Sequence, residues 1–140
     1  MCTSAEPVFS RRYYPCFDEP SFKAIFALTI KVKHPSHLAI SNTHVAKITL
    51  DSDGSRWFNF EDTPLMSTYL FCMIVGKFEV KSLKSSKGVE INVCVPAGRL
   101  KEGEYALELG KRSLEFFEEY FGIEYPLKKL DLVSVHDMHV

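Results

Sequence analysis

The sequence lacks any apolar run long enough to cross a membrane. Its longest run, Leu70 to Gly76, falls far short of the roughly 20 residues that a membrane-spanning helix needs. An excess of charge of one sign is also missing, because 17 basic and 18 acidic residues give a net charge of −1. Without a basic stripe, nucleic acid is not an expected partner. The first residues lack the charged-then-apolar layout of a signal peptide. The sequence predicts a soluble segment with no membrane span.

Cysteine is sparse, and its spacing argues against the common disulfide and metal frameworks. The four cysteines, Cys2, Cys16, Cys72 and Cys94, form no C-x-x-C pair. Cys72 and Cys94 lie inside apolar strand patterns, where a free thiol behaves as a small hydrophobic side chain. We therefore expect reduced thiols rather than disulfides or a zinc knuckle.

The motifs of several enzyme classes are absent too. The sequence has no G-x-S-x-G, Walker loop, G-x-G-x-x-G or EF-hand loop, so nucleophile-elbow hydrolases and nucleotide binding have no support. Histidines occur in two i, i+3 pairs, His34 with His37 and His136 with His139. Neither pair belongs to H-E-x-x-H, which places two ligands and a general base on one helix. We expect these histidines to lie at the surface and not to bind metal.

Alternating apolar residues dominate the first 96 residues. From Phe22 to Val32 the even positions are apolar and several odd positions are Lys or Thr, the pattern of one half-buried strand. The run from Met66 to Val80 is apolar on both faces, as in a central strand that is covered twice. Shorter strand patterns occur at 38–40, 45–50 and 56–61, between these two stretches, and at 89–95, after them. With turn signals between them, these strands predict a β-sandwich or a similar sheet domain.

The pattern changes at residue 97, where a polar linker begins. From Glu104 the apolar period becomes helical, and one helical face carries Leu107, Leu114, Phe117 and Phe121. Glu118 falls on the opposite side, which we expect to be solvated. Gly122 stands where a left-handed C-terminal cap is needed. One more strand is expected at 129–135, so the sequence predicts a domain boundary near residue 97.

The segment P-C-F-D-E-P, from Pro15 to Pro20, concentrates groups that could bind a cation. Its two prolines stiffen the loop and remove backbone donors. Acidic side chains in such turns, here Asp18 and Glu19, usually accept hydrogen bonds from nearby backbone amides. We therefore favour a structural turn over a site.

Five blocks of the sequence together resemble one enzyme family. They are RRYYPCFDEPSFKAIFALTI (11–30), HLAISN (37–42), TPLMSTYL (63–70) with VGKFE (75–79), KGVEINVCVP (87–96) and YALELGKRSLEFFEEYFGIEYPLKKLDLVSV (105–135). The first resembles A-R-x-x-F-P-C-F-D-E-P-x-x-K-A-x-F of the aminopeptidase N and oxytocinase family of zinc aminopeptidases, and the others follow in the order of that family. The resemblance covers nearly the whole chain.

The resemblance implies an architecture. Residues 1–96 are similar to the C-terminal part of the family's N-terminal domain, a β-rich saddle that is incomplete here. Residues 97–140 are similar to the first helix and strand of the thermolysin-like α/β catalytic domain. The implied fold is mainly β, followed by one helix and a strand, with the remainder of the aminopeptidase chain as an expected partner.

The family's zinc chemistry lies elsewhere in its sequence. Members carry P-D-F and a G-A-M-E-N loop after this last strand, whereas here His136 and Met138 stand where the family has Pro and Phe. Further on, members carry H-E-x-x-H and a distant Glu, which bind zinc and activate water. The resemblance implies zinc in the full-length enzyme and no catalytic or metal-ligating residue in this chain.

The resemblance implies that one region of this chain contacts the substrate. Members have T-Q-x-E-(P/A) upstream of P-C-F-D-E-P, and its Glu helps to bind the N-terminal amine of the peptide substrate. T-S-A-E-P at residues 3–7 is similar to this motif and places Glu6 in that role, with Ser4 where the family usually has Gln. Pairing of a carboxylate with an ammonium group suits an exopeptidase.

Two hypotheses of function follow. In the first, the chain is part of a zinc-dependent aminopeptidase and contributes to the substrate pocket and the domain joint, while the chain alone is silent. In the second, it is a truncated, non-catalytic binding or regulatory module that pairs through open sheet edges. Family members are cytosolic enzymes or type II membrane ectoenzymes, so the resemblance leaves the compartment open.

Overall fold

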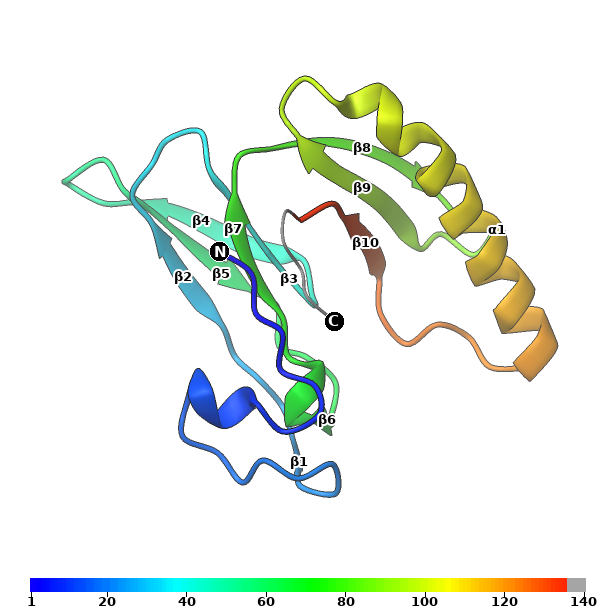
Figure 1. Ribbon diagram of the computed structural model, residues 1–140, viewed down its shortest axis with the longest axis horizontal. Coiled ribbons are helices and arrows are strands. Elements are labelled where there is room, and N and C mark those ends of the chain that lie inside the picture. The colour runs from blue at the N-terminus through cyan, green and yellow to red at the C-terminus, as the bar shows by residue number, and fades with distance from the viewer. Residues whose placement is uncertain (136–140) are drawn as a thin grey trace. The chain divides into compact units, whose positions relative to one another are not determined.

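Ten β-strands and one α-helix make up residues 1–135, the part of the chain that the computed structural model describes (Figure 1). These residues are mainly β, and the one long helix among them comes late, as the sequence predicts. The chain divides into two units, Met1–Gly76 and Lys77–Val140. The first unit has three sheets and the second has one, and each unit has its own apolar core.

The first unit contains seven strands and two short 3-10 helices. The strands are β1 (Lys23–Ala24), β2 (Thr29–Val32), β3 (Leu38–Ser41), β4 (Val45–Leu50), β5 (Arg56–Phe60), β6 (Met66–Ser67) and β7 (Met73–Gly76), and the 3-10 helices are η1 (Ser10–Arg12) and η2 (Thr68–Leu70). They pair antiparallel as β2-β5-β4, β3-β7 and β1-β6. The stretches predicted at 38–40, 45–50 and 56–61 are therefore strands.

An apolar core joins two of these sheets. Val32 of β2 packs with Phe58 and Phe60 of β5, and the cluster includes Ala39 of β3 and Val75 of β7. Side chains from the β2-β5-β4 and β3-β7 sheets thus share one apolar core.

Two long predicted strands are shorter in the structure. The stretch 22–32 forms β1 and β2 with a break between them, and Phe22 is exposed although the alternation places it inside. The stretch 66–80 is not one central strand but β6, η2, β7 and the start of the next strand. Hydroxyl groups explain this second break. Ser67 Oγ donates to the carbonyl of Pro20 (2.7 Å) and Thr68 Oγ1 donates to Asp18 Oδ1 (2.7 Å), which fastens the chain to the P-C-F-D-E-P turn.

The second unit is a hairpin followed by a helix and a parallel strand. Its elements are β8 (Phe78–Lys84), β9 (Glu90–Pro96), η3 (Leu100–Gly103), α1 (Glu104–Phe121) and β10 (Lys129–Val133). The sheet order is β10-β9-β8, with β8 antiparallel and β10 parallel to β9. Helix α1 lies along one face of this sheet, where Leu107 and Leu114 join a core with Ile91 and Val93 (Figure 1). Gly122 caps α1 in the left-handed region (φ 63°), as predicted.

The packed face of α1 differs from the predicted one. Glu118, expected in solvent, is buried, because its Oε1 accepts a hydrogen bond from the backbone N–H of Tyr125 (2.8 Å) in the loop after the helix. Phe117 and Phe121, expected on the packed face, are 50% and 62% exposed. The helix is therefore rotated so that a polar side chain closes its C-terminal end.

The two units divide at Gly76, before the position where the sequence changes from strands to helix. The division falls at this earlier position because β9 pairs with β10, a strand that follows the helix in the chain. This pairing places β9 in the second unit. The predicted boundary at residues 96 and 97 concerns the domains of the longer enzymes that the sequence resembles, and it stays a prediction.

Candidate functional site

The first three residues extend the sheet of the first unit along β7. Thr3 N–H donates to the carbonyl of Met73 (3.0 Å), and Met73 N–H donates to Thr3 Oγ1 (2.9 Å). Val75 N–H donates to the carbonyl of Met1 (2.9 Å), and Cys2 forms a bridge with Ile74. The backbone just before Ser4 is therefore fixed to the strand β7.

Ser4 and Glu6, the two site residues predicted from the sequence, lie together in an exposed turn. Both side chains are exposed, whereas Ala5 between them is buried. The carbonyl of Ala5 accepts a hydrogen bond from the backbone N–H of Phe9 (2.8 Å), which closes the turn around Glu6. The carboxylate of Glu6 thus stands on an anchored loop and is open to a ligand.

Tyr13 also contacts this turn, and sequence reasoning missed it. Its hydroxyl accepts a hydrogen bond from the backbone N–H of Ser4 (3.1 Å) and donates one to the carbonyl of Ser4 (3.2 Å). The one signal in the sequence is that Tyr13 occupies a position that A-R-x-x-F-P-C-F-D-E-P leaves open. The motif therefore gives no expectation for Tyr13.

Asp18 of the P-C-F-D-E-P turn is a buried anchor and not an open ligand. Its carboxylate is 3% exposed and accepts hydrogen bonds from Thr68 Oγ1 (2.7 Å), from the backbone N–H of Arg11 (3.1 Å) and from Arg11 Nε (3.3 Å). Burial alone would raise the pKa of the Asp18 carboxyl, but the hydrogen bonds from Thr68 and Arg11 outweigh it and hold the pKa below its usual value. The structural interpretation of this turn is therefore correct for Asp18.

Asp18 also fixes the helix that carries Tyr13. Arg11 lies within η1, and its Nη2 donates to the carbonyl of Asp18 (2.8 Å) in addition to the contacts with the carboxylate. Tyr13 follows directly as the C-cap of η1, where its N–H donates to the carbonyl of Ser10 (2.9 Å). A continuous series of contacts therefore leads from the buried carboxylate of Asp18 to the backbone of Ser4.

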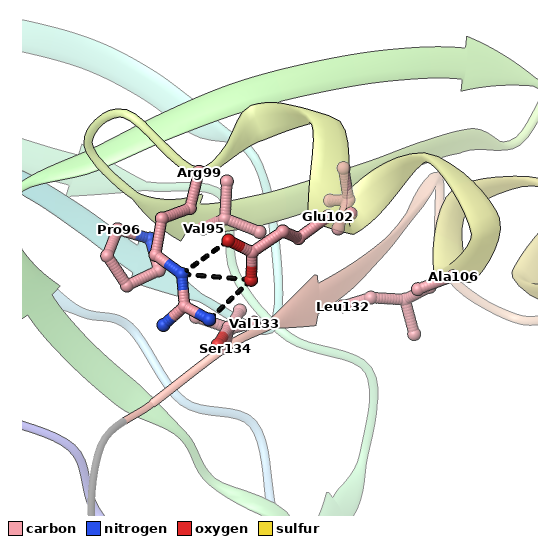
Figure 2. Close-up of a pocket in the computed structure, with 10 residues that line it drawn as sticks. Val95, Pro96, Arg99, Glu102, Ala106, Leu132, Val133 and Ser134 are labelled. Atoms are coloured by element: carbon pink, nitrogen blue, oxygen red, sulfur yellow. Dashed lines mark hydrogen bonds and ion pairs between the residues drawn. The ribbon is translucent and has the colours of Figure 1, made fainter.

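A separate pocket of about 380 Å³ lies in the second unit, at the carboxyl ends of β9 and β10. Its lining is mostly apolar and includes Val95, Ala106 and Leu132 (Figure 2). Figure 2 shows Arg99 and Glu102 at its edge, where Arg99 Nε donates to both carboxylate oxygens of Glu102 (2.8 and 2.9 Å). Because these two charges neutralise each other, the pocket suits an apolar side chain better than an ion.

No three of the His, Cys, Asp and Glu side chains in residues 1–135 come together as a metal ion would require. The rings of His34 and His37 stack with their centroids 4.4 Å apart, and Ser36 hydrogen-bonds to His34 Nδ1. His136, Met138 and His139 lie outside the described residues. The residues present in 1–135 do not fit the zinc of the family that the sequence resembles.

Cys2, Cys16 and Cys94 form no disulfide. Cys94 is buried in β9, and burial, with a smaller contribution from the charge of Asp131, raises the pKa of its thiol to about 11. Such a thiol stays protonated and acts as a core side chain, as predicted from its apolar surroundings.

Comparison with known proteins identifies the family. Residues 1–70, half of the chain, match the Peptidase M1 N-terminal domain. The chain belongs to the M1 peptidase family. It is 43% identical over 136 residues to aminopeptidase M1-C of Oryza sativa subsp. japonica and 41% identical over 135 residues to endoplasmic reticulum aminopeptidase 1 of Homo sapiens. It is also 39% identical over 137 residues to the puromycin-sensitive aminopeptidase of Caenorhabditis elegans.

These alignments cover nearly all of this chain but little of each relative. Each of them includes 96% of this chain, which spans 15% of the rice protein and 14% of the human and nematode proteins. Among residues 1–135 no helix is both long enough and apolar enough to span a membrane. The resemblance read from the five sequence blocks is confirmed.

Proposed function

We propose that this chain is a segment of a zinc-dependent aminopeptidase that removes N-terminal residues from peptides, and that Glu6 helps to hold the free amine of the substrate. The observation that carries the proposal is 43% and 41% identity, across 96% of the chain, to two proteins named aminopeptidases. Zinc and peptide hydrolysis belong to the full-length enzyme, and this segment contributes part of the substrate pocket and the domain joint.

The chemistry of Glu6 suits this role. A carboxylate binds an ammonium group through charge-assisted hydrogen bonds, which are about twice as strong as neutral ones. The side chain of Glu6 is exposed and belongs to a turn that is closed by the hydrogen bond from Phe9 to Ala5. Ser4 lies two residues away in the same turn, and we assign it a neighbouring contact with the substrate.

Apolar side chains on the surface support the role in a domain joint. The outer face of α1 exposes Phe116, Phe117, Tyr120 and Phe121 to between 50% and 71%. Their rings stack in pairs along the helix, Phe116 on Tyr120 and Phe117 on Phe121, both with centroids 5.8 Å apart. A face of this kind is suited to contact with another part of a protein, and we propose that the remainder of the aminopeptidase covers it.

The role of Glu6 is tested in the full-length aminopeptidase that contains this segment. Replacement Glu6→Gln keeps the shape of the side chain and removes its charge. We expect KM for an aminoacyl amide to rise by about tenfold or more, because hydrogen bonds to charged groups contribute roughly 1.5–3 kcal/mol. The measurement is steady-state hydrolysis of substrates with a free α-amine.

Glu19→Gln is the matched control, because Glu19 is also exposed and lies in the same unit. We expect KM for the Glu19→Gln enzyme to equal that of the unmodified enzyme. An unchanged KM in the Glu6→Gln enzyme would contradict the assignment of Glu6 as an amine ligand.

The second candidate function is a non-catalytic binding module. The observation that favours it is the same aromatic face of α1, which could take up an apolar segment of another protein. The two candidates differ in the sequence that follows Val140 in the transcript. Continuation into G-A-M-E-N and H-E-x-x-H supports the aminopeptidase, whereas a stop codon supports the module.

A further inference from the structure

We propose that Tyr13 is a positioning residue for the amine of the substrate, because its hydroxyl fastens the backbone of Ser4 and so orients Glu6. The inference rests on the proposed role of Glu6 and adds a residue through which Glu6 is held. Tyr13 itself touches neither the reacting bond nor the metal in this assignment.

The contact between Tyr13 and Ser4 is a clamp rather than a single bond. One hydroxyl accepts from the N–H of Ser4 (3.1 Å) and donates to the carbonyl of the same residue (3.2 Å). Rotation of either peptide unit of Ser4 breaks at least one of these bonds. The turn that begins at Ser4 therefore has its direction set by the position of one phenol oxygen.

The clamp adds to two other backbone contacts near Glu6. Thr3, which precedes Ser4, is bonded to Met73, and Phe9, which follows Glu6, donates its N–H to the carbonyl of Ala5. The side chain of Glu6 is exposed, so no packing fixes its rotamer. The position of the Glu6 carboxylate is therefore set by the backbone. This matters because a small displacement of a binding group strongly weakens its contribution to substrate binding.

Tyr13 is itself well fixed for this task. Its backbone N–H bonds to Ser10 at the end of η1, and η1 is attached through Arg11 to the buried carboxylate of Asp18. The ring is 44% exposed, so it is held by these backbone contacts and by its hydroxyl rather than by deep burial. Asp18 is therefore connected to the turn of Ser4 and Glu6 by a series of hydrogen bonds through Arg11 and Tyr13.

Tyr14 provides a matched control on the next residue. Its hydroxyl also donates to a backbone carbonyl, that of Thr68 (3.2 Å), which lies outside the turn of Ser4 and Glu6. Tyr14→Phe therefore removes one phenol hydroxyl and its hydrogen bond to a backbone carbonyl without touching the clamp. Tyr13→Phe removes the clamp and keeps the ring.

The experiment compares steady-state kinetics of the full-length aminopeptidase that contains this segment, in five forms: unmodified, Tyr13→Phe, Tyr14→Phe, Glu6→Gln, and Tyr13→Phe combined with Glu6→Gln. We expect Tyr13→Phe to raise KM for an aminoacyl amide about fivefold, the loss of one to two hydrogen bonds, with kcat changed less than twofold. Tyr14→Phe should leave KM unchanged.

The double variant separates positioning from general structure. If Tyr13 acts through Glu6, Tyr13→Phe adds no further rise in KM once Glu6 is Gln. A second variant, Tyr13→Leu, should give the same KM shift as Tyr13→Phe, and thermal unfolding midpoints confirm that each form is folded.

The outcomes are distinct. An unchanged KM in Tyr13→Phe, or an equal KM rise with and without the carboxylate of Glu6, overturns the role of Tyr13 while the proposed function stands. An unchanged KM in Glu6→Gln overturns the assignment of Glu6 itself. A KM rise in Tyr13→Phe that disappears in the Glu6→Gln background supports both.

Discussion

Asp51, in the turn between β4 and β5, has a half-buried carboxylate that accepts several hydrogen bonds. Its Oδ2 accepts hydrogen bonds from Lys31 Nζ (2.7 Å) and Trp57 Nε1 (3.1 Å), and its Oδ1 accepts one from Ser52 N–H (2.8 Å). The bonds from Lys31, Trp57 and Ser52 lower the pKa of the Asp51 carboxyl to about 2. The ionised form thus holds three strands of one sheet together.

This pKa predicts how stability depends on pH. The folded pKa of Asp51 lies below the unfolded value of about 4, so its contribution is present above pH 4 and is lost as the pH falls through about 2. We expect Asp51→Asn to lower the thermal unfolding midpoint at pH 6 and to reduce the fall in midpoint between pH 4 and pH 2. Circular dichroism across this range gives both quantities.

The exposed Asp62 provides the control for this prediction. Asp62→Asn makes the same change of charge away from the turn and should leave the acid dependence as it is. If Asp51→Asn and Asp62→Asn give the same pH profile, Asp51 does not carry the effect.

Single residues also mark the limit of what the sequence predicts. The two prolines around Asp18 predict a turn, and that interpretation needs only local stereochemistry. The bond between Tyr13 and Ser4 crosses nine residues, and it depends on where η1 places a ring. Contacts of that kind follow from tertiary packing, so no local pattern predicts Tyr13 as part of the site.

Among the elements, α1 begins where two buried valines leave no room for a side chain. A Cβ on Gly103, the N-cap of α1, would lie 2.8 Å from Val93 Cγ2 and 3.1 Å from Val95 Cγ1. Both valines belong to the core strand β9 and have stiff, branched side chains. The close approach of the helix to the sheet thus requires glycine at this position.

We expect Gly103→Ala to destabilise the chain by about 1–3 kcal/mol, the usual cost of overpacking a core. Gly110→Ala is the control, because its Cβ would meet only the end of the flexible Leu132 side chain closely, at 2.7 Å. Alanine also gains roughly 1 kcal/mol over glycine in a helix. Urea unfolding of both variants measures the difference, and equal stability of the two would contradict this account of Gly103.

The elements were predictable where one period runs between clear turns. The strands β3, β4, β5 and β9 and the helix α1 match the sequence patterns. Prediction failed where side chains reach across the chain. Ser67 and Thr68 bond to the turn at Pro20 and Asp18 and interrupt a long apolar run. Glu118 bonds to Tyr125 and rotates the packed face of the helix. These three hydrogen bonds join residues far apart or in different elements, so the periodicity of apolar residues does not predict them.

At the scale of the whole molecule, the question is what this chain does without the rest of an aminopeptidase. The chain spans 14–15% of the length of its relatives and contains no H-E-x-x-H. A bound zinc ion lowers the pKa of its water molecule to about 7 and so makes it a nucleophile at neutral pH. In the proposed division of roles, the longer enzyme supplies the residues that hold this ion.

We expect the purified 140-residue chain to bind no stoichiometric zinc and to hydrolyse no aminoacyl amide. Elemental analysis after dialysis measures the zinc, and release of the amine product measures turnover. The full-length aminopeptidase, assayed in parallel, is the positive control. One zinc per chain together with real turnover would contradict the proposed division of labour.

On the ribosome, β9 emerges well before the strand that completes its pairing. The register joins Glu90 to Lys129 and Cys94 to Val133, so all of α1 must be synthesised between the two strands. At about 5–20 residues per second, one edge of β9 stays open for on the order of a few seconds, while β8, made earlier, already covers the other edge. A nascent chain that pauses within α1 therefore presents an unpaired strand to its neighbours, and translation speed over this helix becomes a determinant of yield.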